Sequence, residues 1–179
     1  IFGSIGRRSR SWLSSAAMRT VTHIYGLSAD GGLQLRPARL WLDGKPRGEL
    51  AFVPDLRRRP PQAGRVLCAA DLLPLWGGVP QTPLAPPYCQ QFRLGDFHME
   101  LLPAGSTPGA AALAIEGGAR DVLVATAARP DPLPLADPLP PYDADVVVVD
   151  ATLADQEHAS TAHLQFEVYE AVDELLDGR

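Results

Sequence analysis

The segment Asp145-Val146-Val147-Val148-Val149-Asp150 places four consecutive valines between two acids. Valine favours extended backbone because its branched Cβ restricts χ1, so the segment predicts a β-strand. Since the run contains no polar residue, we expect the strand to be covered on both faces of a sheet. The segment therefore indicates a protein of the α/β (α+β) class whose sheet contains this strand.

Outward from this segment toward the N-terminus, short apolar runs alternate with turn residues. The runs predict strands, and the proline-rich stretches between them predict surface connections. The predicted strands are residues 21–25, 33–36, 39–42, 49–53, 65–69, 91–94, 97–102, 110–115 and 121–125, the last two as a hairpin. A short helix is predicted over residues 70–76, and surface loops over 80–87 and 130–141.

Toward the C-terminus the apolar period changes from that of a strand to that of a helix. Leu164, Val168, Val172 and their apolar neighbours recur at helical spacing and predict an amphipathic helix over residues 161–176. Its opposite face is acidic. We expect the apolar face to pack into the core, and binding of a partner is the alternative.

Size and composition indicate one domain with its own core, because 46% of the 179 residues are apolar. Residues 1–17 are basic and serine-rich and contain no acids. We therefore predict that they form a disordered or non-native extension, and we assign residues 18–179 to the domain. A targeting segment and a basic contact arm are the alternatives for residues 1–17. No apolar run is long enough to span a membrane. Cys68 and Cys89 are too distant in sequence for a redox or zinc motif, and as buried thiols they indicate a reducing, cytoplasmic compartment.

Charge is distributed unevenly along a chain whose formal net charge is −5. Residues 130 to 178 include twelve Asp or Glu and no Lys or Arg. Nucleic acids are bound through Lys and Arg, which displace the counterions of the phosphates. The C-terminal third is therefore excluded as a nucleic-acid surface, and any strand would have to bind elsewhere.

Residues 50–60 read LAFVPDLRRRP, and residues 65–73 read RVLCAADLL. These segments resemble the patterns AFVSHAHxDH and RVLATxATAxLL of the metallo-β-lactamase-fold exonucleases, which are related to the cleavage and polyadenylation nucleases and to the bacterial ligase-associated exonuclease. In that family the first pattern carries metal ligands. At the ligand positions this chain has instead Asp55, Arg57, Arg59 and Pro60.

Later segments resemble further motifs of the same family. Residues 102–111, LPAGSTPGAA, are similar to xPAGHxxGSA, and Ser106 stands where the family has a metal-binding histidine. Residues 122–127, VLVATA, are similar to VVVSGD, and residues 145–152, DVVVVDAT, are similar to DVxITEST.

In the last two motifs Ala127 replaces the bridging aspartate of the family, whereas Asp150 keeps an acid. The resemblance covers roughly residues 21–158. It implies a metallo-β-lactamase-like β-sandwich flanked by helices, here as a truncated half without the second domain that larger members insert.

The replaced residues bear on activity. A two-metal nuclease needs imidazoles and carboxylates that converge on its ions at about 2 Å. Here those ligands are missing, and Arg57, Arg58 and Arg59 add positive charge that repels divalent metal. The resemblance therefore implies a catalytically inactive domain that needs no cofactor and acts as a partner-binding or scaffolding subunit, with a nucleic-acid-processing enzyme as its partner.

Two alternatives stay open. A metal-dependent hydrolase could use a relocated zinc or manganese site built from Asp55, His98, Asp150 and His158, in which the two acids are the candidate catalytic residues. A polyanion-binding module could instead hold phosphate or a nucleic-acid backbone on the three arginines at 57, 58 and 59, because guanidinium forks match phosphate oxygens. An exposed, solvated loop is the plainer interpretation of these arginines.

Overall fold

The computed structural model describes residues 26–27, 33–42, 49–58, 64–77, 82–129, 133, 135–151 and 159–178. It divides the chain into two compact units, Ile1–Val149 and Asp150–Arg179. Several predictions concern positions outside the described residues, namely the strand over 21–25, the extension over 1–17, and the candidate site residues Arg59, Pro60 and His158.

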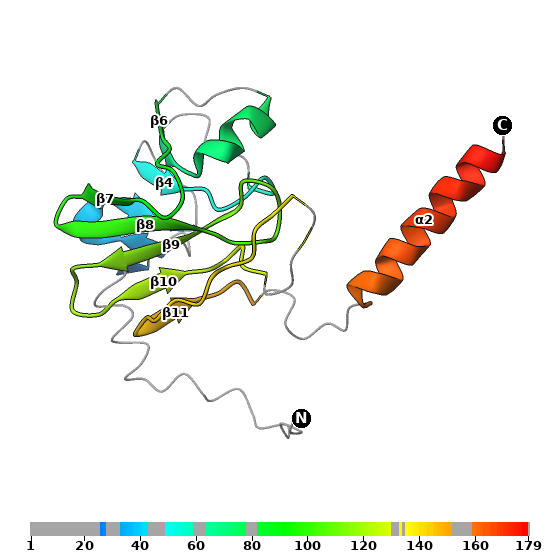
Figure 1. Ribbon diagram of the computed structural model, residues 1–179. Coiled ribbons are helices and arrows are strands. Elements are labelled where there is room, and N and C mark those ends of the chain that lie inside the picture. Colours follow the sequence, from blue (N-terminus) through cyan, green and yellow to red (C-terminus); the bar gives the residue numbers. More distant parts are fainter. Residues whose placement is uncertain are drawn as a thin grey trace, which may run out of the picture. The chain divides into compact units, whose positions relative to one another are not determined.

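The first sheet has six strands, which are hydrogen-bonded to one another in chain order. They are β1 (Gly26–Leu27), β2 (Leu33–Leu35), β3 (Leu40–Trp41), β4 (Leu50–Phe52), β5 (Arg65–Leu67) and β6 (Thr82–Leu84). Two of them, β4 and β6, are labelled in Figure 1. β1 to β3 pair antiparallel, and the pairs from β3 to β6 are parallel. Since parallel strands point the same way, the carboxyl ends of β4 and β5 lie next to each other at one end of the strands, and their amino ends lie next to each other at the opposite end.

Strand β6 corrects the prediction of a loop over residues 80–87. Its register pairs Pro83 with Val66 of β5. Proline cannot donate a ladder hydrogen bond, but it is tolerated in a strand at the edge of a sheet, and β6 is the last strand in the order of this one. The strands predicted over 33–36, 39–42, 49–53 and 65–69 are confirmed, each in shortened form.

The second sheet has five strands in the order β11-β10-β9-β8-β7. They are β7 (Gln91–Leu94), β8 (Phe97–Pro103), β9 (Ala111–Glu116), β10 (Val122–Val124) and β11 (Val146–Val148). β7 to β10 pair antiparallel, which confirms the predicted hairpin of β9 and β10, and β11 pairs parallel with β10.

The two sheets pack face to face around a shared core. It combines Leu40, Leu50, Phe52 and Leu67 of the first sheet with Met99, Leu101, Leu113 and Val122 of the second. Successive side chains of β9 point to opposite faces of the sheet. Leu113 and Ile115 therefore belong to this core, whereas Ala112 and Ala114 belong to a cluster on the other face. The protein is therefore α+β in class, with a β-sandwich as its body.

Connecting segments cover the outer faces of both sheets. The 3-10 helix η2 (Ala70–Trp76) confirms the helix predicted over 70–76, and its Leu72 packs with Val66 on the first sheet. On the second sheet, Leu139 and Tyr142 pack against the outward-facing cluster. The stretch predicted as a surface connection over 130–141 therefore also shields apolar strand residues.

Strand β11 corrects the expectation of burial on both faces. Val146 and Val148 pack against the core, but Val147 is 54% exposed and Val149 is 60% exposed. β11 is the last strand in the order of its sheet, so it receives cover from the core on one face only. The prediction of a strand was right, and the prediction that it is covered on both faces was wrong.

The two cysteines differ in their surroundings. Cys68 is buried, and burial raises the pKa of its thiol to about 11. Cys89 is exposed, so the prediction of two buried thiols is correct for Cys68 alone.

The second unit contains α2 (Thr161–Asp177), which confirms the predicted helix. Ser160 caps it, because its hydroxyl accepts a hydrogen bond from the backbone N–H of His163 at 3.2 Å. Every side chain described between residues 162 and 178 is exposed. Within the described part of this unit, nothing packs against the apolar face of α2. No described helix is long and apolar enough to cross a membrane.

Candidate functional site

The first segment of the candidate site lies just past the carboxyl end of β4. Pro54 O accepts a hydrogen bond from Ala111 N at 2.7 Å, and this bond crosses from the first sheet to the start of β9 in the second. The next residue, Asp55, is thereby fixed where the two sheets meet. Its side chain is 1% exposed, and it is the one charged residue that is buried within the described part of the chain.

The second segment is the loop of residues 104–110, which joins β8 to β9. Gly105 and Gly109 have φ angles of 79° and 76°, which residues with a Cβ rarely adopt. A Cβ on Gly109 would lie 2.9 Å from the backbone of Leu72 in η2. The loop therefore rests directly on η2, and Ser106 is held between two glycine turns.

The third segment, residues 125–129, follows β10 and lies beside this loop. Gly105 pairs with Ala128 in an antiparallel bridge, and Arg129 N donates to Ala104 O at 2.7 Å. A Cβ on Gly105 would lie 2.9 Å from Arg129 O, so the two backbones touch. Three segments that are far apart in sequence thus meet at one edge of the sandwich.

Asp55 and Ser106 make the side-chain contact at this meeting point. Ser106 Oγ donates a long hydrogen bond to Asp55 Oδ2 at 3.5 Å, across 51 positions of sequence. The two residues predicted to share a site from their places in the chain are therefore brought together.

Arg57 neutralises the buried carboxylate of Asp55. Its backbone N–H donates to Asp55 Oδ1 at 3.0 Å, its Nε donates to Oδ2 at 2.6 Å, and its Nη2 forms an ion pair with the same oxygen. The Arg57 side chain is 64% exposed, whereas that of Asp55 is 1% exposed. A buried carboxylate is costly without a partner, so the arginine next to it removes most of that cost while keeping its own contact with water.

This arrangement suits an ion pair better than a metal ion. A zinc site needs about four nitrogen, sulfur or oxygen ligands around one point. Here Oδ2 of Asp55 already accepts from a guanidinium and a hydroxyl, and neither group is among the usual ligands of zinc. Across the described ranges, no group of three His, Cys, Asp or Glu side chains is placed to hold a metal.

The predicted cationic loop needs a correction. Arg57 was expected to present a fixed positive charge, but its charge is matched by Asp55. Arg58 is half-buried, and its backbone N–H donates to Asp55 O at 3.3 Å. Arg59 lies outside the described residues.

The residues proposed for a relocated metal site are spread over the chain. His98 is the second residue of β8, and five residues further on, at Pro103, this strand ends next to the loop that carries Ser106. At about 3.3 Å per residue, His98 is roughly 16 Å along the strand from that end. It is not brought to Asp55. Asp150 is exposed and begins the second unit.

The pairing of Arg57 with Asp55 was missed, because residue 57 was interpreted as a replaced metal ligand, a phosphate contact or a solvated charge. The signal was present in the sequence as Asp-x-Arg directly after a strand. An aspartate in that position accepts a hydrogen bond from the backbone N–H of the residue two positions later. This turn also brings the side chain of that later residue, here Arg57, back toward the carboxylate. The glycine contacts with η2 and Arg129 carried no comparable signal.

Comparison with known proteins adds no assignment. No protein-family model matches the chain, and no curated protein sequence matches it significantly.

Proposed function

We propose that this chain is a catalytically inactive member of the metallo-β-lactamase-fold nuclease family that serves as a partner-binding subunit. One observation carries the proposal. Asp55 and Ser106, which the resemblance places at two metal-ligand positions, are in hydrogen-bond contact, and Arg57, at a third such position, donates to the same carboxylate. These contacts support the proposal, because a guanidinium and a hydroxyl already occupy the carboxylate oxygen that a metal ion would need.

The ion pair supports inactivity for an electrostatic reason. The guanidinium of Arg57 is a permanent cation, and it lies beside the Asp55 carboxylate, where a metal ion would have to bind. A divalent ion at this point would meet a fixed positive charge and would also have to remove Asp55 from its partner. Without the ions, nothing generates hydroxide or stabilises the leaving oxygen of a phosphodiester.

The exposed face of α2 supports a role in partner binding. At 100° per residue, most apolar side chains of the helix fall on one half, together with Gln165, and the acids fall on the other half, together with Phe166. The large exposed apolar residues of that half are Leu164, Val168, Tyr169, Val172, Leu175 and Leu176. A continuous apolar surface of this kind marks an interaction site.

The acidic half of α2 indicates the chemistry of the partner. It carries Glu167, Glu170, Asp173, Glu174 and Asp177, with no Lys or Arg in the helix. In a pair of identical helices packed through their apolar halves, the acids that border this half, Glu167 and Asp173, would face no basic side chain of the other copy's helix. The matching partner has an apolar groove with Lys or Arg along its rim, and the family resemblance suggests a DNA- or RNA-processing enzyme that also binds a polyanion.

The inactive half of the proposal predicts a negative nuclease assay. Purified full-length chain, supplied with zinc or manganese, is expected to cleave neither single-stranded nor duplex DNA or RNA above the level of an Arg57→Ala, Asp55→Asn double variant. Metal-stimulated cleavage that Asp150→Asn or His98→Ala abolishes would show that a relocated site is active, and it would overturn the proposal.

The partner-binding half predicts that α2 is required for association. Replacing Val168 and Leu175 with aspartate should abolish co-purification with a nucleic-acid-processing enzyme, because it places charge in the centre of the apolar face. The matched control, His163→Asp, lies on the acidic half and should leave the complex intact. Circular dichroism checks that the helix persists, and a complex that survives the double substitution would contradict this role for α2.

A further inference from the structure

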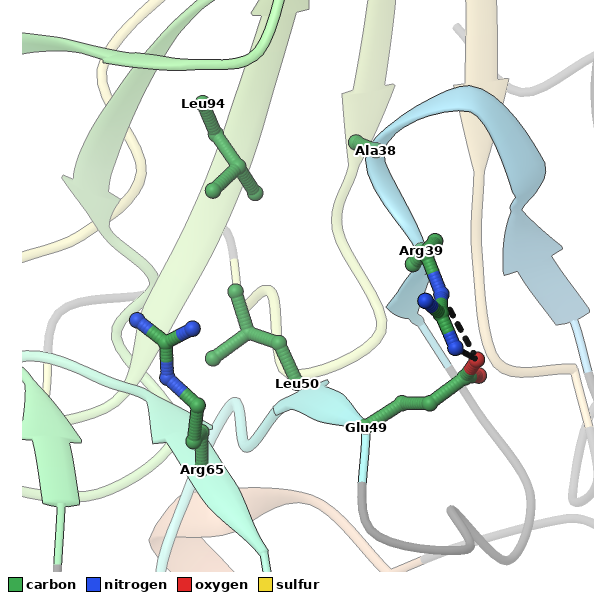
Figure 2. Close-up of a pocket in the computed structure, with 6 residues that line it drawn as sticks. All are labelled: Ala38, Arg39, Glu49, Leu50, Arg65 and Leu94. Carbon is green, nitrogen blue, oxygen red and sulfur yellow. Dashed lines mark hydrogen bonds and ion pairs between the residues drawn. The ribbon is translucent and has the colours of Figure 1, made fainter.

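A pocket lies at the other end of β4 from Asp55. It has a volume of about 280 Å³. It is lined by the amino ends of β4 and β5, the turn before β3 and the end of β7, so it opens between the two sheets (Figure 2). The residues around it are Ala38, Arg39, Glu49, Leu50, Arg65 and Leu94.

One wall of this pocket is a rigid polar cluster centred on Glu49. Its Oε1 accepts from Arg39 Nε at 3.0 Å and Nη2 at 2.8 Å, and its Oε2 accepts from Trp41 Nε1 at 2.6 Å and Gln34 Nε2 at 2.7 Å. These bonds, above all that from Arg39, lower the pKa of Glu49, so the carboxylate stays ionised. Because four donors already occupy its two oxygens, it has little capacity left to bind a cation from solution.

The opposite wall carries a guanidinium that has no such partner. Arg65 is the first residue of β5, and its side chain is exposed beside Leu50, its neighbour in register on β4. Within the described ranges no carboxylate forms an ion pair with it. Among the described residues that line the pocket are two arginines and one glutamate, so their summed charge is +1 and the unmatched charge is that of Arg65.

Between the two walls the surface is apolar. Leu50 separates Arg65 from the Arg39–Glu49 pair, and Leu94 lies beyond it (Figure 2). Leu50 is 7% exposed, so its position is fixed by the core of the sandwich. A ligand in this space would meet a cationic fork on one side and leucine side chains beside it.

We propose that this pocket binds a small carboxylate with a compact apolar body, its carboxylate held by Arg65 and its body resting on Leu50 and Leu94. Guanidinium forks match the two oxygens of a carboxylate with parallel hydrogen bonds. A single negative charge balances the single excess positive charge of the pocket. The volume is slightly below the usual range for drug-sized ligands, so the ligand is of fragment size.

The test is a titration of the full chain with benzoate, followed by two-dimensional amide NMR. Benzoate is expected to shift the amide signals of residues 50, 65 and 94, whereas the neutral isostere benzamide should not. Arg65→Gln should weaken benzoate binding at least about tenfold, because it removes a charged hydrogen-bond pair. Arg120→Gln, which removes an exposed arginine in the β9–β10 turn, should leave the affinity unchanged.

Three outcomes would overturn the assignment. Equal binding of benzoate and benzamide would show that charge has no part in recognition. Retained affinity in Arg65→Gln would remove the proposed anchor. Tighter binding of phenyl phosphate than of benzoate would show that the pocket prefers a dianion. Each of these results leaves the proposal of an inactive nuclease fold unaffected, because the pocket and the Asp55 site share no residue.

Discussion

Replacing Arg57 with alanine is expected to lower the free energy of unfolding by about 2 kcal/mol. The substitution removes the Nε and Nη2 contacts to Asp55, whose side chain is 1% exposed. Among the described residues, the backbone N–H of residue 57 and the hydroxyl of Ser106 remain as its donors. Loss of one partner of a fully buried pair costs more, roughly 3–5 kcal/mol, but Arg57 is itself largely exposed. Chemical denaturation followed by circular dichroism measures the difference.

Two controls separate this effect from a general loss of charge. Arg120→Ala removes an exposed arginine and should change stability by less than about 0.5 kcal/mol. Combining Arg57→Ala with Asp55→Asn should cost less than the sum of the single substitutions, because the buried charge is removed together with its partner. Equal stability of Arg57→Ala and Arg120→Ala would show that the ion pair contributes nothing.

A larger loss, about 3 kcal/mol, is expected for Gly109→Ala. The residue has a φ of +76°, which costs a residue with a Cβ roughly 1–2 kcal/mol. The new Cβ would also lie 2.9 Å from the Cα and N atoms of Leu72, so the loop and η2 would have to separate. Both effects act on the loop that carries Ser106.

Gly95→Ala is the matched control for this substitution. Gly95 has a φ of +62°, but a Cβ there meets nothing within 4 Å. It should therefore show the conformational cost alone, and the difference between the two variants measures the contact of the loop with η2. Equal losses would contradict the packing of loop 104–110 on η2.

The sequence predicted the strands well because their apolar runs and turns are local signals. The family resemblance places Asp55, Ser106 and Ala127 at positions of metal-binding residues, and the segments that carry them lie together in the structure. What the sequence could not predict depends on neighbours in space. Exposure of Val147 follows from the place of β11 at the end of its sheet, and the strand at Thr82–Leu84 follows from the edge position that tolerates Pro83.

The same limit applies to the site. Whether Arg57 points into solvent or onto a carboxylate depends on the turn after β4, which the Asp-x-Arg pattern indicates, and on the burial of Asp55, which residue types alone do not show. The positive-φ glycines illustrate the point: Gly95 and Gly109 have similar backbone angles, yet only Gly109 touches a helix. Sequence reasoning missed the pairing of Arg57 with Asp55.

Zinc bound per chain, determined by native mass spectrometry after exposure to zinc and dialysis, is the most direct measurement of the central claim. A triple variant, Asp55→His, Arg57→His and Ser106→His, serves as the comparison, because it restores imidazoles at the three positions that the family resemblance assigns to ligands. We expect the natural sequence to retain no zinc and the triple variant to retain it. A stoichiometric zinc ion on the natural sequence, lost on Asp55→Asn, would contradict the claim that the Asp55–Arg57 pair has replaced the metal.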